Sequence, residues 1–126
     1  MIDVESGISV IVEAVNARDP KLAGELDIAA PEALEETLQQ LDERWPRLML
    51  TRGDLDGSAV GVVWMPDRNE AYRKVGHVEL RPEDDTRPLE IIEGPRPGLV
   101  AEEPAGRRVA EWESGDAMDR GEGPWV

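Results

Sequence analysis

The spacing of apolar residues divides the first two thirds of the chain into segments of helical and strand period. Over residues 5–18 the helical positions are Ile8, Ile11, Val12 and Val15. Ser6 is the expected N-cap, and Asp19-Pro20 is the expected stop. Because these residues are β-branched, a strand over residues 8–12 is nearly as plausible. The pattern favours a helix but leaves both alternatives open at residues 8–15.

Residues 31–45 carry the clearest helical pattern. One apolar stripe runs through Leu34, Leu38, Leu41 and Trp45. Pro31 suits the first helical position, and the glutamates that follow it suit the positive end of the helix dipole. Pro46 ends the segment. We therefore predict an amphipathic helix over residues 31–45.

The period changes to that of strands after residue 46. Alternation over 47–52, an apolar run over 59–65 and weak alternation over 72–80 predict three antiparallel strands. The segments 53–57 and 66–69 have the composition of turns and would join them as hairpins. A further short strand is expected at residues 26–28.

The C-terminal third is rich in proline and glycine. It holds six of the ten prolines, and short strands are conceivable at residues 89–92, 99–101 and 109–112. We predict an α+β fold in which one or two helices pack on a small antiparallel sheet. Residues 1–81 would form the compact domain, and residues 82–126 an extended arm. The expected partner-binding anchors of this arm are Trp112, Trp125, Leu99 and Val109. For the two tryptophans, packing back on their own domain is the alternative.

Composition sets further limits. Hydrophobic residues make up 40% of the 126 residues, so the chain can form a core although it has no Phe. The absence of cysteine excludes disulfides and thiolate metal sites. The longest apolar runs, 8–12 and 59–65, are too short to cross a bilayer, and the acidic N-terminus is unlike a signal peptide. We expect a protein that is cytoplasmic during assembly and is then carried in a virion.

The net charge of −14 comes from 28 acidic and 14 basic residues, of which only two are lysines. Molar salt shortens the Debye length to about 3 Å and removes most of the self-repulsion of such a surface. Residues 1–66 carry 13 acids and 5 bases, and residues 67–126 carry 15 and 9. Since the acids follow the whole chain, adaptation to a salty solvent is favoured over mimicry of nucleic acid. Direct nucleic-acid binding is not expected, because no basic face is visible.

No motif indicates catalysis. His77 is the single histidine, and in a strand pattern it is expected to be a surface or half-buried residue. The serines lack a nucleophile elbow, and Asp54-Leu55-Asp56-Gly57 lacks the glutamate that would complete a calcium loop, since Val63 stands there. We expect no catalytic residues, no metal site and no cofactor.

The hypothesis that these features favour is a non-catalytic assembly subunit of a larger protein particle. A virion head, neck or tail component from a halophilic host would combine the charge, the size and the arm. Its partners would be other protein subunits, in a homo-oligomer or a multi-protein assembly, and not a membrane. The alternative is an acidic binding inhibitor, such as an immunity or anti-nuclease protein that mimics nucleic acid.

Overall fold

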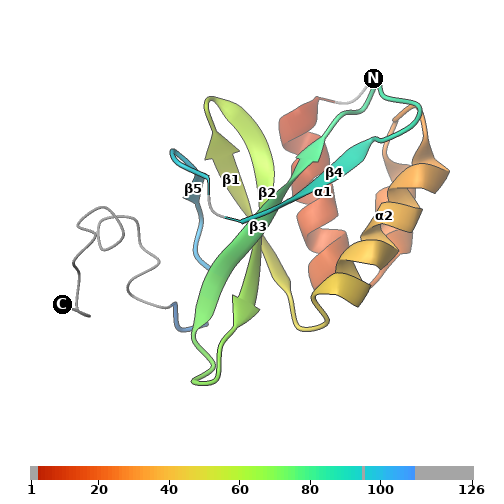
Figure 1. Cartoon of the computed structure of the whole chain (residues 1–126). Coiled ribbons are helices and arrows are strands. Elements are labelled where there is room, and N and C mark those ends of the chain that lie inside the picture. Colours follow the sequence, from red (N-terminus) through yellow and green to blue (C-terminus); the bar gives the residue numbers. More distant parts are fainter. Residues whose placement is uncertain (1–2, 95, 110–126) are drawn as a thin grey trace.

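The N-terminal part of the protein forms two α-helices (Figure 1). The computed structural model describes residues 3–94 and 96–109. Helix α1, Val4–Asn16, confirms the helical prediction, but its N-cap is Asp3, not Ser6. Asp3 accepts hydrogen bonds from the Ser6 backbone N–H at 2.9 Å and from the Ser6 hydroxyl at 3.0 Å. Ser6 therefore lies inside the first turn of the helix and donates to the side chain of the capping residue, Asp3.

Helix α2, Pro31–Arg44, begins and ends within one residue of its predicted bounds. Pro31 occupies the start of the helix, where its missing N–H costs no intrahelical bond. Between the helices lies a 3₁₀ helix, η1, Pro20–Glu25. The prediction of a strand at residues 26–28 is wrong. This segment is irregular, and the side chains of Leu26 and Ile28 are buried in the core.

Within residues 3–94 and 96–109 the sheet has five strands, in the order β4-β3-β2-β1-β5, and all neighbours are antiparallel. The strands are β1 Met49–Leu55, β2 Ser58–Pro66, β3 Tyr72–Leu80, β4 Leu89–Glu93 and β5 Val100–Ala101. The turn expected at 53–57 is narrower than predicted, because Gly53 pairs with Val60 inside the β1–β2 ladder. The α+β fold class is confirmed.

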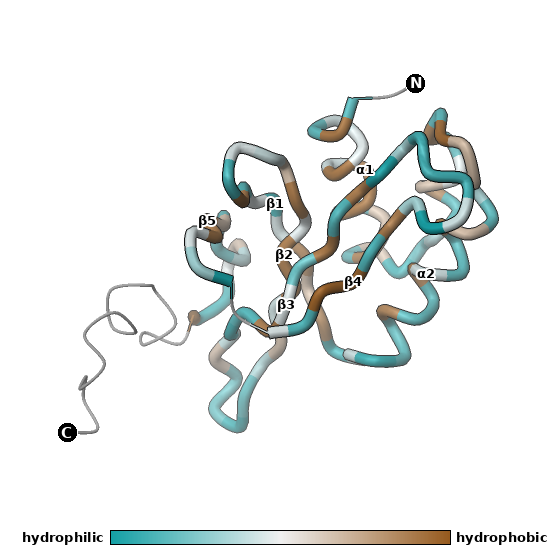
Figure 2. The backbone as a smooth tube through the Cα atoms, turned by 45° about the horizontal axis from the view of Figure 1, so that its top comes forward, coloured by the Kyte–Doolittle hydropathy of each residue, from teal (hydrophilic) through white to brown (hydrophobic). Residues whose placement is uncertain are grey.

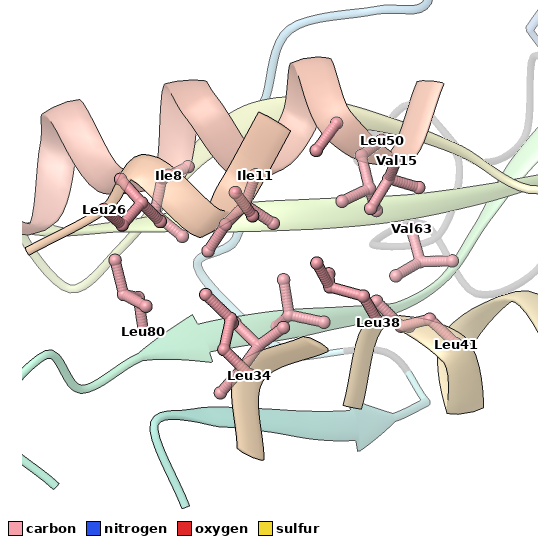
Figure 3. Packing of buried hydrophobic residues seen from close by; sticks show 14 of the residues in the cluster. Ile8, Ile11, Val15, Leu26, Leu34, Leu38, Leu41, Leu50, Val63 and Leu80 are labelled. Carbon is pink, nitrogen blue, oxygen red and sulfur yellow. The ribbon is translucent and has the colours of Figure 1, made fainter. Parts of the chain in front are cut away.

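The main core lies between the two helices and one face of the sheet (Figure 3). Helix α1 contributes Ile8 and Ile11, and helix α2 contributes its predicted stripe Leu34, Leu38 and Leu41. The strands supply Leu50, Val63, Val78, Leu80 and Leu89. The core is thus built from aliphatic side chains, as the absence of Phe requires.

The region after residue 81 contributes two of the five strands. β4 pairs with β3, and β5 pairs with β1 at the opposite end of the sheet. Leu89 of β4 is 1% exposed and belongs to the main core. The division of the chain at residue 82 and the extended arm stay predictions, and residues 110–126 lie outside the described range.

Candidate interaction surface

The face of the sheet opposite the helices carries a second apolar cluster. Val60, Val62 and Trp64 alternate along β2 and are each at most 2% exposed. Tyr72 from the start of β3 completes the buried set, and Met49 and Leu55 of β1 pack against it. Its fully buried residues include two aromatic side chains, whereas the fully buried residues of the main core are aliphatic.

A β-bulge places Tyr72 on this second face. The β2–β3 register runs regularly to the pair Val63–Gly76, and the next pair is Trp64–Lys74. One extra residue of β3 is therefore accommodated here, and the side-chain alternation is reversed beyond it. Tyr72 consequently joins the Trp64 cluster, although Leu80, an even number of residues away, lies in the main core.

Trp64 is oriented by a hydrogen bond inside the sheet. Its indole Nε1 donates to the Thr51 hydroxyl at 2.8 Å, and Thr51 is only 8% exposed. A buried indole N–H requires such a partner, since it has lost water. The pair fixes the ring in place between β1 and β2.

Residues 99–109, which we call the C-terminal strap, pack against this cluster. The strap begins along the edge of β1, where Glu102 N–H donates to the Arg52 carbonyl at 2.9 Å (Figure 2). It ends beside β3, where Tyr72 N–H donates to the Arg108 carbonyl at 2.7 Å. The Arg107 guanidinium lies 5.8 Å from the centre of the Tyr72 ring. Backbone bonds therefore hold the strap at both ends.

Gly53 allows the strap to approach β1. A Cβ atom at this position would lie 2.6 Å from Val62 Cγ2 and 2.7 Å from the Val100 carbonyl oxygen. Both distances are too short for a side chain, so only glycine permits the pairing of β1 with β5.

The four predicted anchor residues divide into two pairs. Leu99 and Val109 lie in the strap, are partly buried and pack against the Trp64 cluster of their own chain. Val109 also forms a parallel bridge with Tyr72. Trp112 and Trp125 lie outside the described residues. The periodicity of the sequence could not reveal Tyr72 and Trp64 as the receptors of the strap, because the bulge changes the face on which Tyr72 lies.

His77 lies on the same face but is more deeply buried than expected. It is opposite Val62 on β2 and Ile92 on β4, and its side chain is 1% exposed. Its Nε2 lies 3.1 Å from Glu79 Oε2, and its Nδ1 has no hydrogen-bond partner among the described residues. The expectation of a surface or half-buried histidine was wrong. β4 pairs with the edge of β3 that a three-stranded sheet would leave free, and this pairing places Ile92 beside His77.

The charged residues beside His77 form a chain of ion pairs. Arg81 contacts Glu79 at 2.8 Å and Glu90 at 2.5 Å. Each carboxylate on this side of β3 and β4 therefore has a positively charged neighbour. Within the described residues, no group of three or more His, Cys, Asp or Glu side chains could hold a metal ion.

Three aspartates in the described part of the chain have a lowered pKa, each because it accepts backbone hydrogen bonds. The N–H of Ser6 lowers the pKa of Asp3, that of Ala71 lowers the pKa of Asp67, and that of Arg87 lowers the pKa of Asp84. Asp3 caps a helix, and the other two close turns. These carboxylates are explained by local structure.

The exposed acids are distributed over the whole described surface. They occur on both helices, in the β1–β2 and β2–β3 turns, in the β3–β4 loop and on the strap. Examples are Glu5, Glu13, Glu32, Glu36, Asp56, Glu70, Glu83, Asp85 and Glu102. This distribution matches the even spread of acids along the sequence.

Comparison with known proteins gives no relative from which a function can be transferred. No family, no curated protein and no solved structure matches the chain. None of the helices in the described part of the chain has the length and apolar character needed to span a membrane.

Proposed function

We propose that this protein is a non-catalytic structural subunit of a larger protein particle, such as the head, neck or tail of a virion in a halophilic host. The observation that carries the proposal is the C-terminal strap. Its backbone is bonded to β1 at one end and to Tyr72 at the other. The chain therefore leaves the sheet at a defined position, and its last 17 residues follow with Trp112 and Trp125.

An extension anchored in this way suits the capture of a neighbouring subunit. The anchor reduces the entropy that would be lost on binding, because residues 99–109 are already fixed on the sheet. Tryptophan is among the residues that contribute most to protein interfaces. Trp112 and Trp125 would supply the contacts, and Leu99 and Val109 would hold the base of the arm on its own sheet.

The acidic surface supports a salty environment for this assembly. A nucleic-acid mimic would gather its carboxylates on one face, whereas here they occur on every side of the described structure. Arginines also lie among them, as in the pairs Arg18–Asp42 and Arg47–Glu70. The distribution favours a solvated subunit over the alternative of an acidic inhibitor.

Light scattering of the full chain across protein concentration and salt tests the proposal. We expect particles larger than a monomer, which grow as salt increases because the charge of −14 is screened. The variant Trp112→Ala/Trp125→Ala should keep the circular dichroism of the parent and lose this higher-order association. Monomers under all conditions would refute the assembly function.

A further inference from the structure

The two edges of the sheet differ in whether their outward backbone groups have hydrogen-bond partners. At the β1 side, both outward backbone groups of Leu50 are bonded, because the Asn16 side chain donates to its carbonyl at 2.9 Å and accepts from its N–H at 2.8 Å. The Arg18 guanidinium donates to the Leu48 carbonyl at 3.0 Å. Further along, β5 and Glu102 cover the rest of β1. Side chains and the strap thus close this edge.

At the opposite edge, β4 pairs with a strand on one side only, β3, within the described residues (Figures 1 and 2). Gly94 N–H donates to the Val75 carbonyl and Arg81 N–H donates to the Pro88 carbonyl, so the even-numbered residues of β4 face β3. The N–H and C=O groups of Ile91 and Glu93 therefore point away from the sheet. Ile91 is partly exposed and Glu93 is exposed, whereas Leu89 is 1% exposed. The accessible edge is residues 91–93.

The charges on this edge are balanced locally. Arg44 of α2 contacts Glu93 at 2.6 Å, and Arg81 of β3 contacts Glu90 at 2.5 Å. β4 thus presents no unpaired carboxylate, although the whole chain carries a charge of −14. A second acidic copy can approach this strand at a lower electrostatic cost than it would meet at the acidic helices.

We propose that β4 binds β4 of a second copy of this chain and joins the two sheets into one. The inference deepens the proposed function, because it names one subunit contact of the assembly. An antiparallel pair about a two-fold axis at Ile92 sets Ile91 opposite Glu93 of the other copy, twice. This register uses all the accessible outward groups and does not need those of Leu89. It also places the two Ile92 side chains face to face.

Cysteine cross-linking tests the register, and the natural chain contains no cysteine to interfere. The two Ile92 residues would form a non-hydrogen-bonded pair with Cα atoms about 4.5 Å apart, within the range for a disulfide. Ile92→Cys should therefore give a covalent dimer under mild oxidation in high salt. In Glu90→Cys the two thiols would be four residues out of register, roughly 13 Å apart, and should stay reduced. A monomeric Ile92→Cys protein, or equal cross-linking of both variants, would overturn the proposal.

A proline on the edge tests the backbone contact in the otherwise natural chain. Since the Glu93 N–H points away from β3, Glu93→Pro removes no bond within the sheet but blocks the partner strand. We expect Glu93→Pro to weaken dimerisation by about tenfold or more, the loss of a few backbone bonds. Glu93→Ala, which loses the Arg44 ion pair but keeps the N–H, should dimerise nearly as the parent does. Equal dimerisation of the proline and alanine variants would refute the β4 contact.

The same variants separate this inference from the proposed function. Larger particles that form equally well with Glu93→Pro would support the assembly function and refute the β4 contact. Dimers that need the β4 edge, but never grow beyond two copies even with both tryptophans present, would support the contact and refute the function.

Discussion

The Asn16 side chain hydrogen-bonds both backbone groups of Leu50, as a neighbouring strand would. The last residue of α1 bonds both backbone groups of a residue 34 positions away, with its Nδ2 on the carbonyl and its Oδ1 on the N–H. Leu50 is 1% exposed, so these groups cannot turn to water. One side chain thereby ties the helix to the sheet and closes the edge of β1.

The variant Asn16→Ala should destabilise the protein by about 1–3 kcal/mol, because it leaves buried backbone groups without partners. Urea unfolding followed by circular dichroism measures this change in the free energy of unfolding. Asn69→Ala, at an exposed asparagine of the β2–β3 turn, is the matched control and should have a much smaller effect. Equal unfolding midpoints for Asn16→Ala and the parent would show that the two bonds do not contribute to stability.

The Trp64–Thr51 bond makes a separate prediction for the second face of the sheet. Thr51→Val keeps the shape of the side chain but removes the acceptor of the buried indole N–H. The unfolding free energy should fall by about 1–3 kcal/mol. Thr51→Ser retains the hydroxyl and should recover part of that loss. If valine and serine had the same effect, packing and not the hydrogen bond would explain the role of Thr51.

Gly53→Ala should detach the strap from β1. The new Cβ would overlap Val62 and the Val100 carbonyl, and the latter belongs to backbone that can only move away. Hydrogen exchange should become faster at Glu102, whose N–H is bonded to the Arg52 carbonyl. Gly24→Ala is the control, since its Cβ would meet no atom within 4 Å. Unchanged protection of Glu102 in Gly53→Ala would contradict the close approach.

The three aspartates with lowered pKa values predict acid sensitivity. Their pKa is depressed in the folded state, so each contributes stability that is fully present above the unfolded value, near 3.8, and is lost as the pH falls through the folded value. The unfolding free energy of the parent should therefore fall below about pH 4.

Asp3→Asn provides the corresponding control. Asparagine is also a good N-cap but does not titrate, so part of the acid-induced loss should be absent in the variant. Urea titrations at a series of pH values measure both slopes. Identical slopes for the parent and Asp3→Asn would show that the cap carboxylate is not linked to folding.

The charge of −14 predicts that salt stabilises the fold. Raising the salt from about 0.1 M to about 1 M shortens the Debye length from about 10 Å to about 3 Å and weakens the self-repulsion. Thermal unfolding over this range should give a rising midpoint. Glu35→Gln/Glu36→Gln, which removes two exposed acids of α2, should reduce the dependence on salt. Full stability in dilute buffer with no effect of salt would argue against adaptation to a salty solvent.

Local periodicity was sufficient to predict much of the fold. The stripe Leu34, Leu38 and Leu41 became the buried side of α2, and β3 spans the predicted residues 72–80. The short strands near residues 89–92 and 99–101 also exist, as β4 and β5. Each of these elements has a pattern that is complete within a few residues, so no distant contact is needed to recognise it.

The candidate surface was less predictable. Leu99 and Val109 were predicted as partner-binding residues, and the sequence did not indicate that they pack against the Trp64 cluster of their own chain. The bulge that moves Tyr72 to this face depends on how β2 and β3 pair, and no spacing within β3 reveals it. His77 was misplaced for a related reason, because its burial depends on whether β4 is paired with β3.

The sequence by itself determined the α+β class, the position of α2 and β3 and the acidic, aliphatic composition, because helical and strand periods and charge are local properties. Only the tertiary structure decided the order β4-β3-β2-β1-β5, the return of residues 99–109 to the second face and the difference between the two edges. These features join residues far apart in the chain. Asn16 and Leu50 show the principle, since a helix end and a strand edge satisfy one another only after both are placed.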